Sequence, residues 1–191
     1  MTFLYLAPLG AVDDEVLTII ETCLGANFGF ETRRMAPSAE PEYAFDLRRR
    51  QYSSTLILRE WVGRCPSDAA RILAITEKDL FIPMLSFIFG QAQLNGTVAI
   101  ISTARLRQEF YELPANRMLL LARVVKEALH EMGHTFGLVH CPDRTCPMSL
   151  STHIHQVDTK GSEFCASCRA LLRENIGAIY EQAANIMRAE G

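Results

Sequence analysis

The segment HEMGHTFGLVHC, residues 130–141, constrains the fold of this chain more than any other part of its sequence. His130 and His134 are four residues apart, so on a helix their rings lie on one face about one turn apart. Glu131 is rotated by about 100° from His130 around the helix axis. The pattern therefore predicts a helix that presents two imidazoles to a common metal ion, with a carboxylate beside them.

A third histidine can join this site only if the helix stops soon after His134. Gly137 stands midway between His134 and His140, and glycine adopts a positive φ at little cost. We therefore predict a glycine corner at Gly137 and an outgoing strand that carries His140 back to the metal. Three protein ligands and one open position are typical of catalytic zinc, with Glu131 as the general base for an activated water. The alternative is three unrelated histidines.

A cysteine follows the last of these histidines directly, and side chains of adjacent residues in an extended segment point to opposite faces. Cys141 is therefore expected to face away from the metal that His140 faces. The chain has six cysteines, and four of them form a C-x4-C pair and a later C-x2-C pair, a set suited to structural zinc. We predict two zinc ions per chain, one catalytic and one structural, the second bound by Cys141, Cys146, Cys165 and Cys168.

Other interpretations of these residues stay open. The four cysteines could be free thiols or a redox pair, and His153 and His155 are rival ligands, although a polar loop is the expected place for both. Cys23 and Cys65 stand alone in helical patterns and are expected to be small core residues. Glu127, one turn before Glu131, is either a partner of the site or part of a solvated helix face.

Composition excludes several classes of protein. The chain has 191 residues, a net charge of −3 and 49% apolar residues, which fits one globular domain with a small appended subdomain. We expect no nucleic acid and no membrane as partners, and we interpret the basic run 48–50 as a solvated face. The N-terminus lacks a basic region before its apolar stretch, so we expect a cytoplasmic protein with reduced thiols.

The hydrophobic pattern predicts an α/β fold. We expect a mixed, mostly parallel twisted sheet with an antiparallel edge strand, flanked by helices, plus a small zinc-stapled C-terminal helical subdomain. Residues 1–140 would form the first subdomain, ending with the active-site helix, and residues 141–191 the second. Strands are expected at 2–7, 27–35 and 71–76, a hairpin at 85–103 turning at Asn95–Gly96, and helices at 12–24 (ended by Gly25), 47–64, 117–136 (capped by Asn116) and 164–188.

At this point the chain resembles a known family, the archaemetzincins, a branch of the metzincin zinc peptidases. The resemblance rests on HEMGHTFGLVHC, then Cys146-Pro147-Met148, then Cys165-Ala166-Ser167-Cys168, within residues 130–168. It implies a metzincin-like fold, a catalytic zinc on the three histidines, Glu131 as general base, and Met148 in a tight Met-turn beneath the metal. Some metzincin branches place a tyrosine two residues after this methionine, where this chain has Leu150.

The predicted function is hydrolysis of peptide bonds by a zinc metallopeptidase, endopeptidase or aminopeptidase. A peptide or protein substrate would extend along the hairpin arm near Gly90, where Gln91 and Gln93 fit an edge strand, although this arm could equally be ordinary packing. The alternatives are a non-catalytic, zinc-stabilised peptide-binding module and an amidohydrolase acting on a non-peptide amide. The oligomeric state is open, with a monomer expected.

Overall fold

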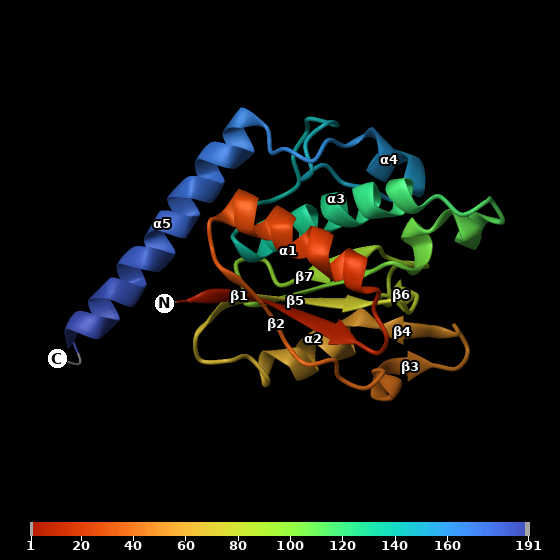
Figure 1. The fold of residues 1–191 in the computed structure, drawn as a ribbon, viewed down its shortest axis with the longest axis horizontal. Helices are drawn as coiled ribbons and strands as arrows, with labels where there is room; N and C mark the ends of the chain where they lie inside the picture. The colour runs from red at the N-terminus through yellow and green to blue at the C-terminus, as the bar shows by residue number, and fades with distance from the viewer. Residues whose placement is uncertain (1, 190–191) are drawn as a thin grey trace.

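The computed structural model describes residues 2–189, and side chains only up to residue 181. Strands and helices alternate along the first two thirds of the chain, and helices dominate the rest (Figure 1). The strands are β1 (Phe3–Leu9), β2 (Thr32–Arg34), β3 (Phe45–Asp46), β4 (Gln51–Ser53), β5 (Ala69–Thr76), β6 (Leu80–Phe81), β7 (Gly90–Ala92) and β8 (Val98–Ser102). The helices are α1 (Asp14–Phe28), α2 (Ser54–Val62), α3 (Arg117–Thr135), α4 (Ile154–Thr159) and α5 (Ala166–Ala189).

The central sheet confirms the predicted fold class. Its five strands lie in the order β2-β1-β5-β8-β7, and every neighbouring pair is parallel except β7–β8. The antiparallel strand β7 is therefore an edge strand, as the hairpin pattern predicts. The turn residue Asn95 has a φ of 52°, the left-handed conformation that asparagine tolerates in tight turns.

Helices cover both faces of the sheet. In Figure 1, α1 and α3 lie on one side of the strands and α2 lies on the other. Along β5, Leu73 and Ile75 belong to the core beneath α1 and α3, whereas Ile72 and Ala74 belong to the core that contains Trp61 of α2. This alternation along a strand buried on both faces explains the continuous apolar run of residues 72–75.

Helix α3, which carries the two histidines, begins where the sequence predicts. The Asn116 side chain accepts a hydrogen bond from the Leu119 amide (3.0 Å), which caps the first turn. The sequence pattern predicts an apolar stripe of Leu121, Val125, Ala128, Leu129, Met132 and Phe136. The observed stripe is shifted at its start, because Leu120 and Val124 are buried whereas Leu121 and Val125 are only half-buried. The reason is that α3 packs against the sheet, α1 and α4 at once.

Two predicted helix boundaries are wrong. Gly25 does not stop the first helix, which continues to Phe28 and ends at Gly29 with a φ of 74°. Residues 27–28 are therefore helical, and β2 is confined to Thr32–Arg34. The helix predicted at 47–64 begins only at Ser54, since residues 51–53 form β4 and the Ser53 side chain caps the helix.

The structure also contains a second, three-stranded sheet in the order β3-β4-β6, which the sequence pattern did not predict. Its strands have two or three residues each, too short for a periodic pattern. Strand β4 pairs with the distant β6, and its backbone amide at Tyr52 bonds to the Asp79 carbonyl (2.8 Å). This long-range pairing displaces the first turns of the predicted second helix.

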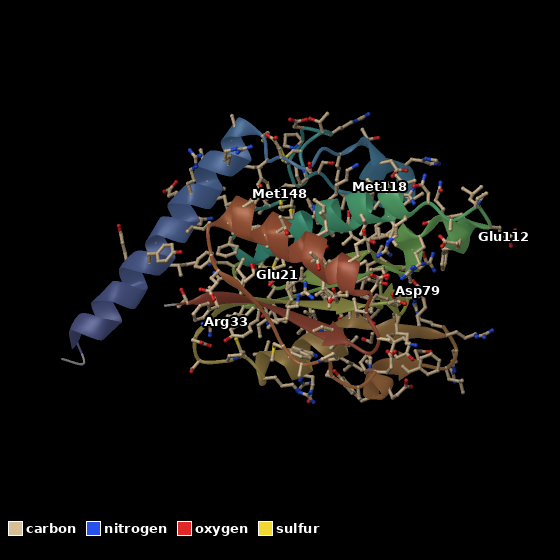
Figure 2. All side chains as sticks on the ribbon, in the orientation of Figure 1. Glu21, Arg33, Asp79, Glu112, Met118 and Met148 are labelled. Carbon is tan, nitrogen blue, oxygen red and sulfur yellow. The ribbon has the colours of Figure 1, made fainter. Side chains whose placement is uncertain are left out.

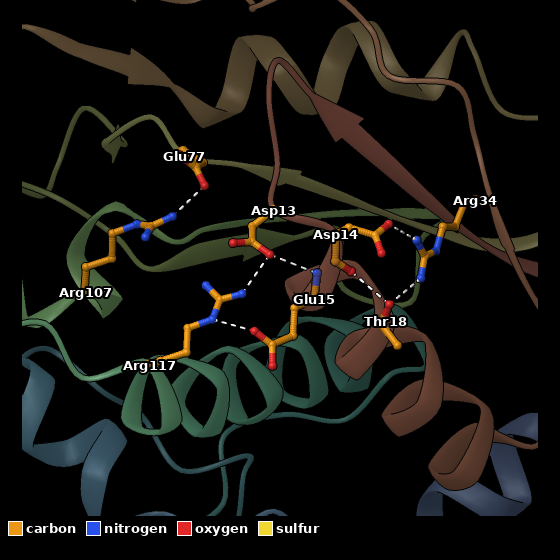
Figure 3. Close-up of polar contacts among 8 residues, drawn as sticks. All are labelled: Asp13, Asp14, Glu15, Thr18, Arg34, Glu77, Arg107 and Arg117. Carbon is orange, nitrogen blue, oxygen red and sulfur yellow. Dashed lines mark hydrogen bonds and ion pairs between the residues drawn. The ribbon is translucent and has the colours of Figure 1, made fainter.

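Ion pairs fasten the start of α1 to its neighbours (Figure 3). Arg117, the first residue of α3, pairs with Asp13 and Glu15 at 2.7 Å each. Arg34 of β2 bonds to Asp14 (2.6 Å). Because these side chains are partly exposed, each pair stabilises the fold by no more than about 1 kcal/mol. Their effect is to fix the position of α3 relative to α1 and the sheet.

Helix α5 forms the last long element and extends away from the sheet in Figure 1. It begins at Ala166. The sequence pattern predicts an apolar side of Leu171, Leu172, Ile176, Ile179, Ala183 and Ile186. Of these, Leu172 is buried and Ile176 and Ile179 pack against the core, whereas Leu171 is 41% exposed. The predicted apolar residues Ala183 and Ile186 lie outside the described side chains. Within residues 2–189, no helix is long and apolar enough to cross a membrane.

Candidate metal centres and the cleft beside them

The two helical histidines point their Nε2 atoms at each other, 3.2 Å apart. Each ring is oriented through its other nitrogen. The Nδ1 atom of His130 lies 2.8 Å from the Pro147 carbonyl oxygen, and that of His134 lies 2.7 Å from the Leu138 carbonyl oxygen. Carbonyl oxygens only accept, so both Nδ1 atoms carry the hydrogen and both Nε2 atoms present a lone pair.

The chain turns sharply after α3, as predicted. Gly137 has a φ of 85°, and the last carbonyls of the helix bond to distant segments. Arg71 donates to the Thr135 carbonyl (3.0 Å), the Asn175 side chain to that of Phe136 (2.7 Å), and the Asn95 amide to that of His134 (2.9 Å). The helix end that carries His134 is therefore held by three separate parts of the fold.

His140 joins the two helical histidines in space. One side-chain nitrogen from each of the three lies within 4.8 Å of the others. The predicted outgoing strand is wrong, since residues 138–140 lie in no strand. The segment is held instead by the backbone amide of Cys141, which donates to the Met148 carbonyl (2.9 Å).

The environment keeps these histidines neutral. Burial lowers the pKa of His130 well below its usual value, and the nearby Lys160 ammonium lowers it further. Burial also lowers the pKa of His134 and of the more exposed His140. Neutral imidazoles with free Nε2 lone pairs are the form that binds a metal ion.

Glu131 is buried beside the histidines and close to the edge strand. Its pKa is raised well above the usual value, mainly by burial and also by the neighbouring Glu127 carboxylate. Gly90 of β7 makes room for it: a Cβ atom there would lie 2.6 Å from Glu131 Cγ and 2.8 Å from its Oε1. The carboxylate therefore occupies the space that a side chain at position 90 would fill.

Glu127 takes part in a buried ion pair with Lys160. Its Oε1 lies 3.6 Å from the Lys160 ammonium, and both side chains are almost fully buried. Burial raises the pKa of Glu127, and the Lys160 charge opposes this. The Lys160 nitrogen also lies 3.4 Å from Nδ1 of His130. Glu127 is thus a partner of the site rather than part of a solvated face.

Met148 packs directly under α3, as expected for a Met-turn. It is fully buried, and its sulfur fits against Gly133, where even a Cβ atom would collide with it. Figure 2 shows Met148 beside the C-terminal end of α3. The preceding Pro147 supports the same helix, since its carbonyl oxygen contacts His130, whereas Leu150 lines the space in front of the histidines.

The four clustered cysteines come together in a second group. One sulfur from each lies within 4.8 Å of the others, and the Cys141 and Cys165 sulfurs are 3.8 Å apart. The hydrogen bond from the Cys168 backbone amide lowers the pKa of Cys165, as expected at the start of a helix. Burial raises the pKa of Cys168 and of Cys141. The adjacent residues His140 and Cys141 thus serve different clusters.

The two other candidate ligands, His153 and His155, belong to neither cluster. Their rings lie 6.2 Å from each other, and neither belongs to the metal-ligand groups found in the described part of the chain. His153 caps α4 and His155 lies within it, so the predicted polar loop is in fact a short helix. Cys23 and Cys65 are partly buried and pack at the edges of the two cores, and Cys65 follows α2 rather than lying in a helix. Burial raises the pKa of the Cys23 thiol to about 11.

A cleft of about 610 Å³ opens in front of the three histidines. The edge-strand segment forms one wall and α3 the other, and residues 150–152 close part of the rim. Apolar side chains dominate the walls, and the ionisable groups among the lining residues are the histidines, Glu127 and Glu131. The apolar lining includes Leu85, Phe87, Phe89, Leu94, Val139 and Leu150.

The free edge of β7 faces this cleft. The Phe89 carbonyl accepts a hydrogen bond from the Ser102 amide of β8 (2.8 Å), and the Gln93 amide donates to the Val98 carbonyl of the same strand (3.1 Å). Hydrogen-bonding directions alternate along an antiparallel strand, so the backbone groups of Gly90 and Ala92 between them point outward. These are the groups that could pair with an added peptide strand.

Comparison with known proteins decides the family. The sequence matches the model of Peptidase family M54 over residues 65–174. It is 41% identical to an archaemetzincin of Methanocaldococcus jannaschii, with 87% of this chain and 90% of that protein covered. The chain belongs to the archaemetzincins. This membership confirms the class of enzyme predicted from the histidine and cysteine motifs, a zinc-dependent peptidase.

Solved archaemetzincin structures share the whole fold. The structure from Methanopyrus kandleri is 37% identical, with a TM-score of 0.82 over 92% of this chain and 96% of that one. A zinc-dependent peptidase from Methanocorpusculum labreanum is 30% identical, with a TM-score of 0.81 over 88% and 99%. The archaemetzincin of Archaeoglobus fulgidus, complexed with malonate, is 34% identical, with a TM-score of 0.77 over 89% and 99%.

Proposed function

We propose that this archaemetzincin hydrolyses peptide bonds at the three-histidine cluster, with Glu131 as the general base. The observation that carries the proposal is the buried Glu131 carboxylate, which lies beside three converging imidazoles at the back of an open cleft. A binding module needs histidines and cysteines to hold its metals, but it has no use for a buried base.

The histidine cluster fits a zinc ion. Zinc–nitrogen bonds of about 2.0–2.1 Å in a tetrahedron place two ligand nitrogens about 3.3 Å apart. The Nε2 atoms of His130 and His134 are 3.2 Å apart. Bound there, zinc supplies Lewis acidity and lowers the pKa of water. Each helical histidine keeps its orientation through a carbonyl of the fold, so the ligands are already arranged.

Glu131 moves the proton in this mechanism. Its carboxylate accepts a proton from the attacking water and then delivers it to the nitrogen of the leaving amine. Burial and the nearby Glu127 carboxylate raise its pKa, which makes the carboxylate a stronger proton acceptor. Gly90 lets the carboxylate lie at the level of the edge strand, where the scissile bond would pass.

The substrate extends the sheet as an added strand in this proposal. Gly90 and Ala92 offer outward backbone donors and acceptors, and a peptide paired with them runs along the cleft past the histidines. Such pairing recognises backbone rather than side chains, which fits a broad peptide or protein substrate and leaves endopeptidase and aminopeptidase action both possible.

The four cysteines hold the second, structural zinc ion in this proposal. Zinc–sulfur bonds of about 2.3 Å place two ligand sulfurs about 3.8 Å apart, as the sulfurs of Cys141 and Cys165 are. Four thiolates leave no open position, so the ion serves to join the segment after α3 to the start of α5. We also propose that residues 141–191 form a small subdomain organised by this ion, in a cytoplasmic monomer without nucleic-acid or membrane partners.

One pair of variants tests the catalytic proposal. Glu131→Gln keeps the shape of the side chain but cannot accept a proton. We expect it to retain the zinc of the wild type, by elemental analysis, and to lose about 10²-fold to 10⁴-fold in peptide cleavage. His134→Ala should lose one zinc per chain together with activity. Full activity in Glu131→Gln would refute the assigned base.

Substrate panels separate the two alternatives. A non-catalytic module would bind peptides without cleaving them in any metal state. An amidohydrolase acting on other amides would leave blocked and unblocked peptides intact and would cleave small acylated amines. We expect cleavage of peptides, dependent on Glu131.

A further inference from the structure

The cleft does not end at the edge strand. A second hollow of about 420 Å³ lies on the other side of β7. Gln91 and Ala92 line both hollows, so the two meet along the strand. The far wall of the second hollow is one face of α2, formed by Thr55, Leu58, Arg59 and Val62.

Strand geometry assigns consecutive substrate side chains to the two hollows. Side chains alternate between the faces of a sheet, also in a strand added at its edge. On β7, Gly90 faces α3 and Glu131, whereas Gln91 faces α2 and accepts a hydrogen bond from the Ser54 hydroxyl (2.6 Å). A substrate paired with β7 therefore places one side chain toward the histidines and the next over α2.

Arg59 gives the second hollow its chemical character. Its side chain is exposed, and within the described part of the chain its guanidinium makes no ion pair and no hydrogen bond. The carboxylate of the adjacent Glu60 forms an ion pair with Arg64 instead, at 2.7 Å. The flanking Leu58 and Val62 are apolar, so the hollow combines one free cation with an apolar floor.

We propose that Arg59 and this face of α2 form a subsite for an acidic residue of the substrate. A guanidinium binds a carboxylate through two parallel hydrogen bonds, and the side chain adjacent to the one over the histidines reaches it. No lysine or arginine lines the main cleft, so the preference is confined to one position of the substrate. The subsite rests on the proposed peptidase function and on strand addition at β7.

Charge reversal tests the subsite. A mixed library of blocked peptides is digested with wild type, Arg59→Glu and Arg64→Glu, and the cleavage positions are read by mass spectrometry. Arg64→Glu is the matched control, since it makes the same charge change just after the same helix. We expect wild type to favour Asp or Glu at one position next to the scissile region.

In Arg59→Glu the preference at that position should shift from acidic to basic residues, by about fivefold or more in relative kcat/KM. Arg64→Glu should behave as wild type. Cleavage without an acidic preference, or with a preference that Arg59→Glu leaves unchanged, would overturn the subsite alone. A wild type that cleaves no peptide would overturn the peptidase proposal and the subsite with it.

Discussion

Gly90 shows what a missing side chain does in this structure. Edge strands of sheets usually place side chains on both faces, but here one position is empty and a buried carboxylate fills the space. A Cβ atom at this position would lie 2.8 Å from the Ile100 carbonyl oxygen as well as from Glu131 Oε1, so neither the strand nor the helix could easily yield. Position 90 therefore sets how closely α3 approaches the substrate edge.

Gly90→Ala should move Glu131 rather than remove it. We expect about a 10²-fold loss of peptide cleavage, because a displacement of about 1 Å at a reacting group costs that much. Zinc content should stay at the wild-type value. Gly177→Ala is the control, since nothing lies within 4 Å of the added methyl group on α5. Equal activity in both variants would show that the contact yields without consequence.

Gly133 and Met148 form a second close contact, on the opposite side of the histidine helix. Gly133→Ala should force the Met148 sulfur away and destabilise the protein by about 1–3 kcal/mol, as overpacking of a core does. Met148→Ala should cost less stability in the Gly133→Ala chain than in the wild type, because the added methyl group occupies part of the space that the sulfur leaves. A double-mutant cycle in urea measures the coupling. Strictly additive effects would contradict direct contact.

At the scale of elements, α3 is held by the segment that follows the Met-turn and contains α4. Arg123 makes two hydrogen bonds to Asp158, Lys126 reaches the carbonyls of Val157 and Asp158, and Glu127 pairs with Lys160. Three successive contacts of this kind lock α4 against the helix that bears the histidines.

The Glu127–Lys160 pair should matter for stability even though it is far from ideal in geometry. Lys160→Met leaves the Glu127 carboxylate buried without a cation, and we expect a loss of about 3–5 kcal/mol in unfolding free energy. Adding Glu127→Gln should recover much of that loss, because no charge then remains buried. Urea titration of the wild type, Lys160→Met and the double variant checks this. A single variant as stable as wild type would show that water reaches the pair.

The Arg123–Asp158 contact predicts a pH dependence. The hydrogen bond from Arg123 lowers the pKa of Asp158, so its contribution is complete above the unfolded pKa of about 3.9 and is lost as the pH falls through the lower folded value. Asp158→Asn should cost about 2 kcal/mol at neutral pH, and the gap to wild type should close below about pH 4. Denaturant unfolding across this range measures the gap. A gap independent of pH would refute the assignment.

Sequence patterns predicted the long elements better than the short ones. The periodic residues of α3 and the turn at Asn95–Gly96 were visible because local chemistry decides them. The end of α1 was not, since both Gly25 and Gly29 could stop a helix and tertiary packing selected the second. The small sheet around β4 could not be predicted from the sequence, because its strands form only through pairing with a distant segment.

At the scale of the molecule, the site motif was predictable because the spacing of metal ligands can be read directly from the sequence. The positions of all three histidines and four cysteines followed from that spacing. Lys160 was not predictable, because a lysine in a polar stretch is normally exposed and only the folded structure buries it. The same holds for Asn175 and Arg71, whose side chains donate hydrogen bonds to the C-terminal end of α3, far away in the sequence.

The cysteine cluster should carry more of the global stability than the histidine cluster. We expect Cys146→Ser to lose one zinc and to lower the thermal midpoint strongly, because structural zinc contributes folding free energy directly. His134→Ala should lose the other zinc with a much smaller change in midpoint, since its ring is oriented by the fold. Elemental analysis and calorimetry of both variants check this. An equal fall in thermal midpoint in the two variants would contradict this ranking of the two clusters.

The hydrogen bonds that hold the C-terminal end of α3 have a consequence for how the enzyme folds during synthesis. All three histidines precede Asn175 in the chain, yet the Asn175 side chain holds the carbonyl of Phe136, two residues after His134. During synthesis the ligands emerge before the residue that fixes them. We expect a growing chain to carry the complete motif without hydrolytic competence, so that a potentially destructive activity appears only after α5 has docked.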